Sequence, residues 1–176
     1  LKRTYAFIEA VKYLAKNNNG YDIVLRPHPM ENSEAWKFFL DGVENVHVIR
    51  DDSISAWVNN SFALMHNQCT TAIEATISNK PVVTYIPFKT MYHDVSISNK
   101  LGYCVETLED LSKTVNNLFD NQRLSNQINS VNEVPNIINQ KIYFDNQELA
   151  AEKITKVWDK FSDHKINVAS NWWIFR

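Results

Sequence analysis

Apolar residues follow two different spacings along the chain. Helical spacing marks the first 16 residues, where Tyr5, Ile8, Val11 and Leu14 recur on one side, and short apolar runs typical of buried strands separate further helical segments. The pattern predicts helices over residues 1–16, 33–40, 54–58, 71–78, 108–119 and 148–161. It predicts strands over residues 21–25, 46–49, 62–65 and 81–86.

The alternation of these strands and helices predicts the fold class. It favours an α/β fold with a mostly parallel sheet, helices on both faces and right-handed crossovers. We therefore expect a Rossmann-like domain over residues 1–165, followed by an aromatic tail over residues 166–176. The Asn-rich stretch 122–140 is interrupted by Pro135 and is expected to be a surface excursion.

Composition and charge exclude several classes of protein. The chain has 176 residues, of which 44% are hydrophobic, and this is enough to build a substantial core. Lys and Arg are interspersed with Asp and Glu, the net charge is -2, and nucleic acid is therefore not an expected partner. Cys69 and Cys104 are too few for a disulfide scaffold and lack metal-ligand spacing, which indicates a reducing, cytoplasmic setting.

The first candidate for chemistry follows the predicted strand 21–25. In open α/β sheets, ligands bind outside the carboxyl ends of the strands. Here the chain continues as Arg26-Pro27-His28-Pro29, in which the two prolines hold His28 in extended backbone. A fixed imidazole can donate a hydrogen bond to a phosphate oxygen, and Arg26 can add positive charge. The alternative is that the motif merely ends the strand and turns the chain.

The second candidate is the polar segment 67–71, which follows the strand 62–65 and opens a helix. The free N–H groups and the positive dipole end of this helix would face the same edge of the sheet, so Thr70 and Thr71 are candidate phosphate ligands. Glu74 has two possible roles. It completes a capping box with Thr71, or it accepts hydrogen bonds from the two hydroxyls of a ribose.

Other polar residues near these strand ends are assigned simpler roles. Cys69 is interpreted as a small packing residue and His66 as a satisfied strand-end histidine. Lys89 and His93, in the loop after strand 81–86, either enter the pocket or stay solvated. Asp51 and Asp52 precede Ser53 at a helix start, where acidic residues are favoured electrostatically, so no metal site is predicted.

The order of these segments resembles the carboxyl-terminal, donor-binding half of the GT-B glycosyltransferases that build bacterial surface polysaccharides, including lipopolysaccharide and capsule. The similar segments are Val24 to Pro29, a helix led by Asp52 and Ser53, residues 67–75 and residues 79–85. They resemble most the surface carbohydrate biosynthesis proteins, which are related to Kdo transferases that use a CMP-sugar. The resemblance covers residues 1–87 well and the remainder only in general architecture.

The resemblance implies roles for individual residues. His28, with Pro29 and Arg26 beside it, would hold the donor phosphate and stabilise the leaving group. Thr70 and Thr71 would bind the phosphate at the helix start, and Glu74 would lie near the ribose. Asn67 and Gln68 belong to the same donor-binding set, although many relatives have a Gly- or Ser-rich segment before this helix. Transfer would be inverting, independent of metal and without a cofactor.

The resemblance also implies partners outside this sequence. Leu1 already lies in a predicted helix, so we expect a longer protein, whose amino-terminal domain supplies the general base and binds a glycan or glycolipid acceptor. The donor would be a nucleotide sugar, with Kdo or a related acid sugar on CMP as one case. The full protein would be cytoplasmic, with peripheral association at the cytoplasmic face of the inner membrane as a further expectation.

Two other functions fit the sequence. A UDP-sugar 2-epimerase has a similar pair of domains but needs several carboxylates in its cleft, whereas these strand ends supply Glu74. A non-catalytic nucleotide-binding or scaffold domain would keep the pocket without a catalytic partner. The helix 148–161 and the tail containing Trp172 and Trp173 are expected to pack on the missing domain, with a membrane-interface anchor as the less favoured alternative.

Overall fold

The computed structural model describes residues 2–51, 53–89, 97–125, 138 and 148–162. Two compact units divide the chain, residues 1–138 and residues 139–176. The boundary that the sequence predicts for the first domain, residue 165, lies outside the described residues. Tail residues 166–176, with Trp172 and Trp173, lie outside the described residues.

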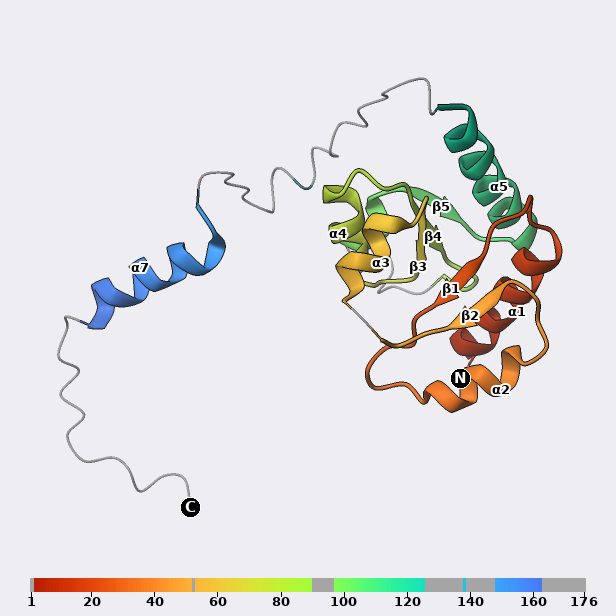
Figure 1. Ribbon diagram of the computed structural model, residues 1–176, viewed down its shortest axis with the longest axis horizontal. Coiled ribbons are helices and arrows are strands. Elements are labelled where there is room, and N and C mark those ends of the chain that lie inside the picture. Colours follow the sequence, from red (N-terminus) through yellow and green to blue (C-terminus); the bar gives the residue numbers. More distant parts are fainter. Residues whose placement is uncertain (1, 52, 90–96, 126–137, 139–147, 163–176) are drawn as a thin grey trace, which may run out of the picture. The chain divides into compact units, whose positions relative to one another are not determined.

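The first unit alternates helices and strands (Figure 1). Its helices are α1 (Lys2–Lys16), α2 (Ser33–Leu40), α3 (Ile54–Asn60), α4 (Thr71–Ile77), the 3-10 helix η1 (Ile97–Lys100) and α5 (Leu108–Ser125). Its strands are β1 (Ile23–Leu25), β2 (Val46–Val48), β3 (Leu64–His66), β4 (Val82–Tyr85) and β5 (Tyr103–Val105). All the predicted helices and strands are confirmed, and α5 extends past the predicted residue 119. The sequence pattern missed η1 and β5.

The described strands form two parallel sheets. In one, β1 pairs with β2 so that Ile23 lies opposite Val46. In the other, the order is β3-β4-β5, with Leu64 opposite Val82. Because every pair is parallel, the carboxyl ends of neighbouring strands lie at the same edge of each sheet.

One face of the sheets is covered by α1, α2 and α5. Two clusters form the core on this side. The first joins Ala10 and Leu14 of α1, Tyr21, Val83, Tyr85, Val105, and Leu111 and Val115 of α5. The second joins Ile8 and Val11 of α1 with Trp36 and Leu40 of α2, against side chains of β1 and β2.

The opposite face of the β3-β4-β5 sheet is covered by α4, which packs on β3 and β4, with α3 beside it (Figure 1). Ala72 and Ala75 of α4 are fully buried there. Helices therefore lie on both faces, as the sequence predicted for a Rossmann-like domain.

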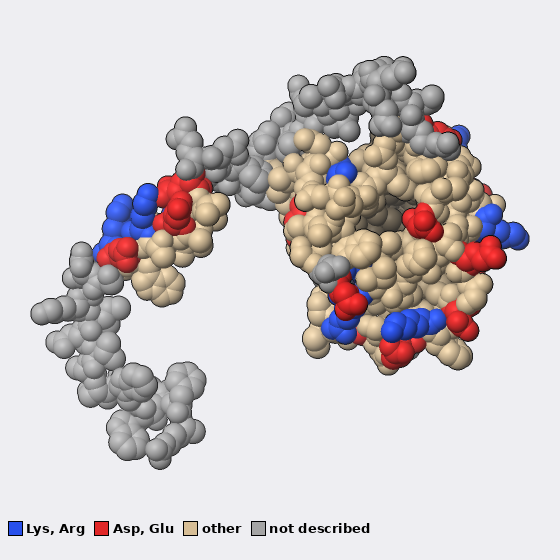
Figure 2. Space-filling model, viewed as in Figure 1, with Lys and Arg blue, Asp and Glu red and all other residues tan. Residues whose placement is uncertain are grey.

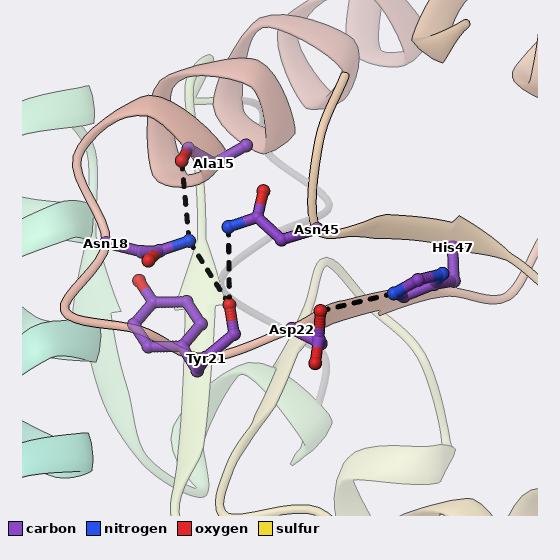
Figure 3. Close-up of polar contacts among 6 residues, drawn as sticks. All are labelled: Ala15, Asn18, Tyr21, Asp22, Asn45 and His47. Atoms are coloured by element: carbon purple, nitrogen blue, oxygen red, sulfur yellow. Dashed lines mark hydrogen bonds and ion pairs between the residues drawn. The ribbon is translucent and has the colours of Figure 1, made fainter. Parts of the chain in front are cut away.

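Polar side chains fix the turn between α1 and β1. The Asn18 side-chain amide donates to the carbonyl oxygens of Ala15 and Tyr21, and the Asn45 amide donates to the same Tyr21 carbonyl (Figure 3). Oδ1 of Asp22, the residue before β1, lies 3.2 Å from Nε2 of His47 on β2. These contacts hold the amino ends of β1 and β2 together, and so help to set their register.

The second unit contains the helix α7 (Ala150–Ser162). Its apolar residues Ile154, Val157, Trp158 and Phe161 are exposed and recur at helical spacing, while charged residues lie on the other side of the helix (Figure 2). The expected packing of this helix on another domain stays a prediction. Of the stretch 122–140, the structure describes the end of α5 and Ile138, and Ile138 is fully buried rather than part of a surface excursion.

Candidate functional site

Two arginines tie together the loops that follow β1 and β2. The Arg26 guanidinium donates to the carbonyl oxygens of Arg50 and Asp51, and Nη2 of Arg50 donates to the Pro29 carbonyl at 2.7 Å. The indole N–H of Trp57 in α3 also donates to the Asp51 carbonyl, at 3.1 Å. Arg26 thus has a structural task at this edge, beside the phosphate contact that the sequence predicts for it.

His28 lies exposed in the first of these loops, with a fixed ring. Its backbone N–H donates to Oε2 of Glu31 at 2.8 Å, and its ring Nδ1 accepts from the Met30 N–H at 3.2 Å. Because Nδ1 is an acceptor, a neutral ring carries its proton on Nε2. Within the described ranges Nε2 bonds to no other residue, so its N–H is available to a ligand. The motif both turns the chain and presents a donor.

His66, at the end of β3, has a structural role. It is 4% exposed, and Nε2 lies 2.9 Å from Thr84 Oγ1 on β4. Nδ1 accepts from the Cys69 N–H at 3.2 Å, which places the ring proton on Nε2. Burial lowers the pKa of His66 to about 4, so the ring is neutral near pH 7. The prediction of a satisfied strand-end histidine is confirmed.

Asn67 and Gln68 are held by neighbouring elements. Nδ2 of Asn67 donates to the Tyr85 carbonyl at 2.7 Å, while its Oδ1 is buried without a partner in the described part of the chain. Gln68 has a φ of 59°, its N–H donates to Asn99 Oδ1 at 2.9 Å, and its Oε1 accepts from Arg3 at 3.2 Å. Both side chains therefore help to shape the loop, and their predicted contact with the donor stays a prediction.

The start of α4 differs from the predicted capping box. Thr70 is the N-cap residue, and its exposed side chain makes no capping hydrogen bond. Glu74 consequently lies one position beyond the N3 residue of a capping box, and its Oε2 accepts from Ser55 Oγ of α3 at 3.3 Å. Oγ1 of Thr71 lies 3.1 Å from Sγ of Cys69. The capping interpretation of Glu74 is wrong, whereas the phosphate and ribose roles at Thr70, Thr71 and Glu74 stay predictions.

The loop after β4 carries the candidate residues Lys89 and His93, of which the structure describes Lys89. Nζ of Lys89 lies 2.8 Å from Oε1 of Glu106, and the two side chains are 76% and 50% exposed. Lys89 therefore forms a solvated surface pair, which fits the simpler of its two interpretations. His93 lies outside the described residues.

The described residues contain neither a metal-binding cluster nor a helix that could span a membrane. None of them form a group of three or more His, Cys, Asp or Glu that could hold a metal ion. Nor does any helix in these ranges combine the length and apolar character needed to cross a bilayer. An open depression of about 530 Å³ lies beside β5 and α5, but its lining contains no residue of the predicted donor site.

A chain of contacts through α3 connects the two candidate loops. The first loop reaches α3 through Arg26, the Asp51 carbonyl and Trp57, and α3 reaches α4 through Ser55 and Glu74. The sequence did not single out Arg3, Arg50, Ser55, Trp57 or Asn99, because their partners are distant in sequence and no local pattern marks them.

Comparison with known proteins bears on the fold. No protein-family model and no curated protein match the sequence. Among solved structures, the crystal structure of TarM, a teichoic acid glycosyltransferase with the GT-B fold, superposes with a TM-score of 0.54. The alignment has 21% sequence identity and covers 90% of this chain. The chain has the fold of one half of a GT-B protein.

This GT-B half spans 32% of the TarM chain. Its likeness to TarM supports the predicted fold without the finer link to Kdo transferases. In the GT-B half, the loops bearing His28 and Thr70 follow the carboxyl ends of β1 and β3, where ligands of open α/β sheets bind.

Proposed function

We propose that this chain is the donor-binding half of a glycosyltransferase that builds a bacterial surface glycan. The observation that carries the proposal is the His28 ring, fixed through Nδ1 and presenting Nε2–H at the carboxyl end of β1. The GT-B fold of the chain supports it. The donor is a nucleotide sugar, and a CMP-linked acid sugar such as Kdo is the first donor to test.

The chemistry follows from the charge that develops on the leaving group. As the glycosidic bond breaks, the departing nucleotide phosphate gains negative charge. A preorganised N–H aimed at that oxygen stabilises the transition state more than the ground state, and this difference accelerates the reaction. His28 supplies the N–H without needing a metal ion. Proton abstraction from the acceptor belongs to the amino-terminal domain, and direct displacement inverts the anomeric centre.

The remaining donor contacts are assigned by position. The hydroxyls of Thr70 and Thr71 bind phosphate oxygens at the start of α4. Glu74 accepts from the ribose hydroxyls, which requires it to exchange its long 3.3 Å contact with Ser55 for the ligand. Lys89 contributes little because Glu106 already pairs with it. The full protein works in the cytoplasm, at the membrane face where its glycolipid acceptor lies.

The test is turnover by the full-length protein, measured as nucleotide released from a panel of nucleotide sugars. His28→Ala should lower kcat by about 10²-fold or more, the scale for loss of one preorganised donor. His47→Ala, which changes an exposed histidine in the middle of β2 that contacts Asp22 before β1, is the matched control and should leave kcat unchanged. Near-normal turnover by His28→Ala would refute the assignment.

A further inference from the structure

The sheet of the first unit is interrupted between β1 and β3. β1 pairs with β2, β3 pairs with β4, and no described strand joins the two sheets. Side chains of both sheets nevertheless enter one core, in which Ile23 of β1 and Met65 of β3 pack on the same cluster. The ring centroids of Tyr21 and Phe62, just before these strands, lie 5.3 Å apart. The two sheets are therefore parts of one layer with an opening between them.

An unpaired strand edge borders the opening on each side. Ile23 donates its N–H to the Asn45 carbonyl at 2.8 Å, and Leu64 donates to the Pro81 carbonyl at 2.9 Å, so both bond away from the opening. Because backbone groups alternate in direction along a strand, the N–H and C=O groups of Val24 and Met65 point towards it. No described strand pairs with these groups.

Helix α1 covers this opening. Its residues Ile8 and Val11 pack in the cluster against β1 and β2, while Ala10 and Leu14 pack in the cluster that contains β4 and β5 side chains. The helix of a β–α–β unit covers the two parallel strands that it connects, through a right-handed crossover. Since α1 leads into β1, the strand that leads into α1 belongs beside β1 and beneath α1, which is where the opening lies.

We propose that the opening receives a further parallel strand, supplied by the polypeptide joined to the amino end of α1. With this strand counted first, the order across the layer becomes 3-2-1-4-5-6, the order of a dinucleotide-binding Rossmann sheet. Such a strand is buried on both faces and hydrogen-bonded on both edges. Its sequence is therefore a short, nearly continuous run of Val, Ile and Leu, joined to α1 by a loop of about 2–6 residues.

This strand changes the composition of the candidate site. In the 3-2-1-4-5-6 order, ligands bind at the carboxyl ends of strands 1 and 4, where the order reverses. The loop from the new strand to α1 then lies between the loop bearing His28 and the segment 67–71. The first turn of α1 already reaches this segment, since Arg3 donates to Gln68 at 3.2 Å. This consequence rests on the proposed function, whereas the strand itself does not.

Amide hydrogen exchange, followed by NMR, tests for the strand. The sample is the full-length protein, in which the polypeptide joined to the amino end of α1 is present. The amides of Val24 and Met65 should exchange as slowly as those of Ile23 and Leu64, because all four then bond to a neighbouring strand. Without the further strand, the Val24 and Met65 amides face the opening and should exchange about 100-fold faster than those of Ile23 and Leu64.

The Cys104 amide is the control for an unpaired strand edge. The Ile86 N–H donates to the Val105 carbonyl, so the Cys104 N–H faces the outer edge of β5 and should exchange faster than the four amides above. Val24 and Met65 amides that exchange as fast as the Cys104 amide would overturn the proposal. No nucleotide is present in the sample, so the result does not depend on the donor site.

Discussion

Nη2 of Arg50 donates to the carbonyl oxygen of Pro29 at 2.7 Å, which joins the loop after β2 to the loop that carries His28. Arg26 makes the reciprocal connection, from the first loop to the carbonyl oxygen of Arg50 at 3.3 Å. A short loop on the surface would otherwise sample several conformations. The paired arginines therefore hold His28 in place before any ligand binds.

Removing the Arg50 side chain should loosen this loop. Arg50→Ala loses a charged donor to a carbonyl and should lower the free energy of unfolding by about 1 kcal/mol. Amide exchange should become faster in residues 28–31. Lys37→Ala, which removes the exposed ion pair with Glu34, is the control and should cost at most about 0.5 kcal/mol. Equal exchange in the two variants would show that Arg50 does not hold the loop.

The buried His66 should make stability depend on pH. Its pKa is about 4 in the folded chain, against an ordinary value of 6.5. Between these values the unfolded state binds more protons, so the free energy of unfolding falls as pH drops from about 6.5 towards 4. The loss approaches about 3 kcal/mol at most, since each pKa unit corresponds to about 1.4 kcal/mol.

Urea unfolding of wild type and His66→Gln between pH 7 and pH 4 measures this effect. Gln keeps one donor and one acceptor but does not titrate, so its stability should change less steeply over the window than that of wild type. The comparison uses the change of the free energy of unfolding with pH, so it holds even if the variant is less stable at every pH. Parallel slopes would mean that His66 is not the group responsible.

Gly102 lies where the chain enters β5 and passes close to β4. A Cβ added there would lie 2.7 Å from the carbonyl carbon of Val82, and nearer still to the carbonyl oxygen. Because the Val82 backbone is held in β4 and cannot rotate away as a side chain would, Gly102→Ala should lower the free energy of unfolding by about 3 kcal/mol. Gly42→Ala is the contrasting case, with open space but a φ of +68°, and should cost about 1 kcal/mol. Thermal unfolding that ranks the two in the opposite order would contradict this packing.

Tyr21 buries a hydroxyl that has no partner in the described part of the chain. Burial also raises the pKa of Tyr21 to about 12, so the hydroxyl stays protonated. Its ring packs against Phe62 and Phe119, at centroid distances of 5.3 and 5.1 Å. Tyr21→Phe keeps these contacts and should leave stability equal or raise it by up to about 1 kcal/mol. A clear loss of stability in urea unfolding would reveal a partner for the hydroxyl.

The sequence predicted the elements whose signal is local. The helix α1 and the strand β4 stand out because apolar spacing and flanking turn residues act within each segment. The strand β5 was missed because it has three residues, two of them exposed, and is defined by its pairing with β4. The predicted capping box between Thr71 and Glu74 was wrong, because the Thr-x-x-Glu spacing alone does not determine the first residue of a helix.

Contacts between distant segments were beyond the sequence pattern. The bond from Arg50 to Pro29 joins residues 21 positions apart, and the bond from Arg3 to Gln68 spans 65 positions. The interruption between β1 and β3 also depends on which strands pair, and the sequence of a single strand does not reveal its neighbours. By contrast, the turn at His28 was predictable, because two prolines restrict its backbone directly.

The most direct test of the donor site is nucleotide affinity in the full-length protein. A thermal-shift screen with CMP, CDP, UDP and GDP selects the nucleotide that stabilises the protein most, and calorimetric titration then compares wild type with His28→Ala. Loss of the Nε2–H donor should weaken binding about tenfold or more, which corresponds to about 1.4 kcal/mol. Equal affinity of wild type and His28→Ala, or no stabilisation by any of the four nucleotides, would contradict a phosphate site at His28.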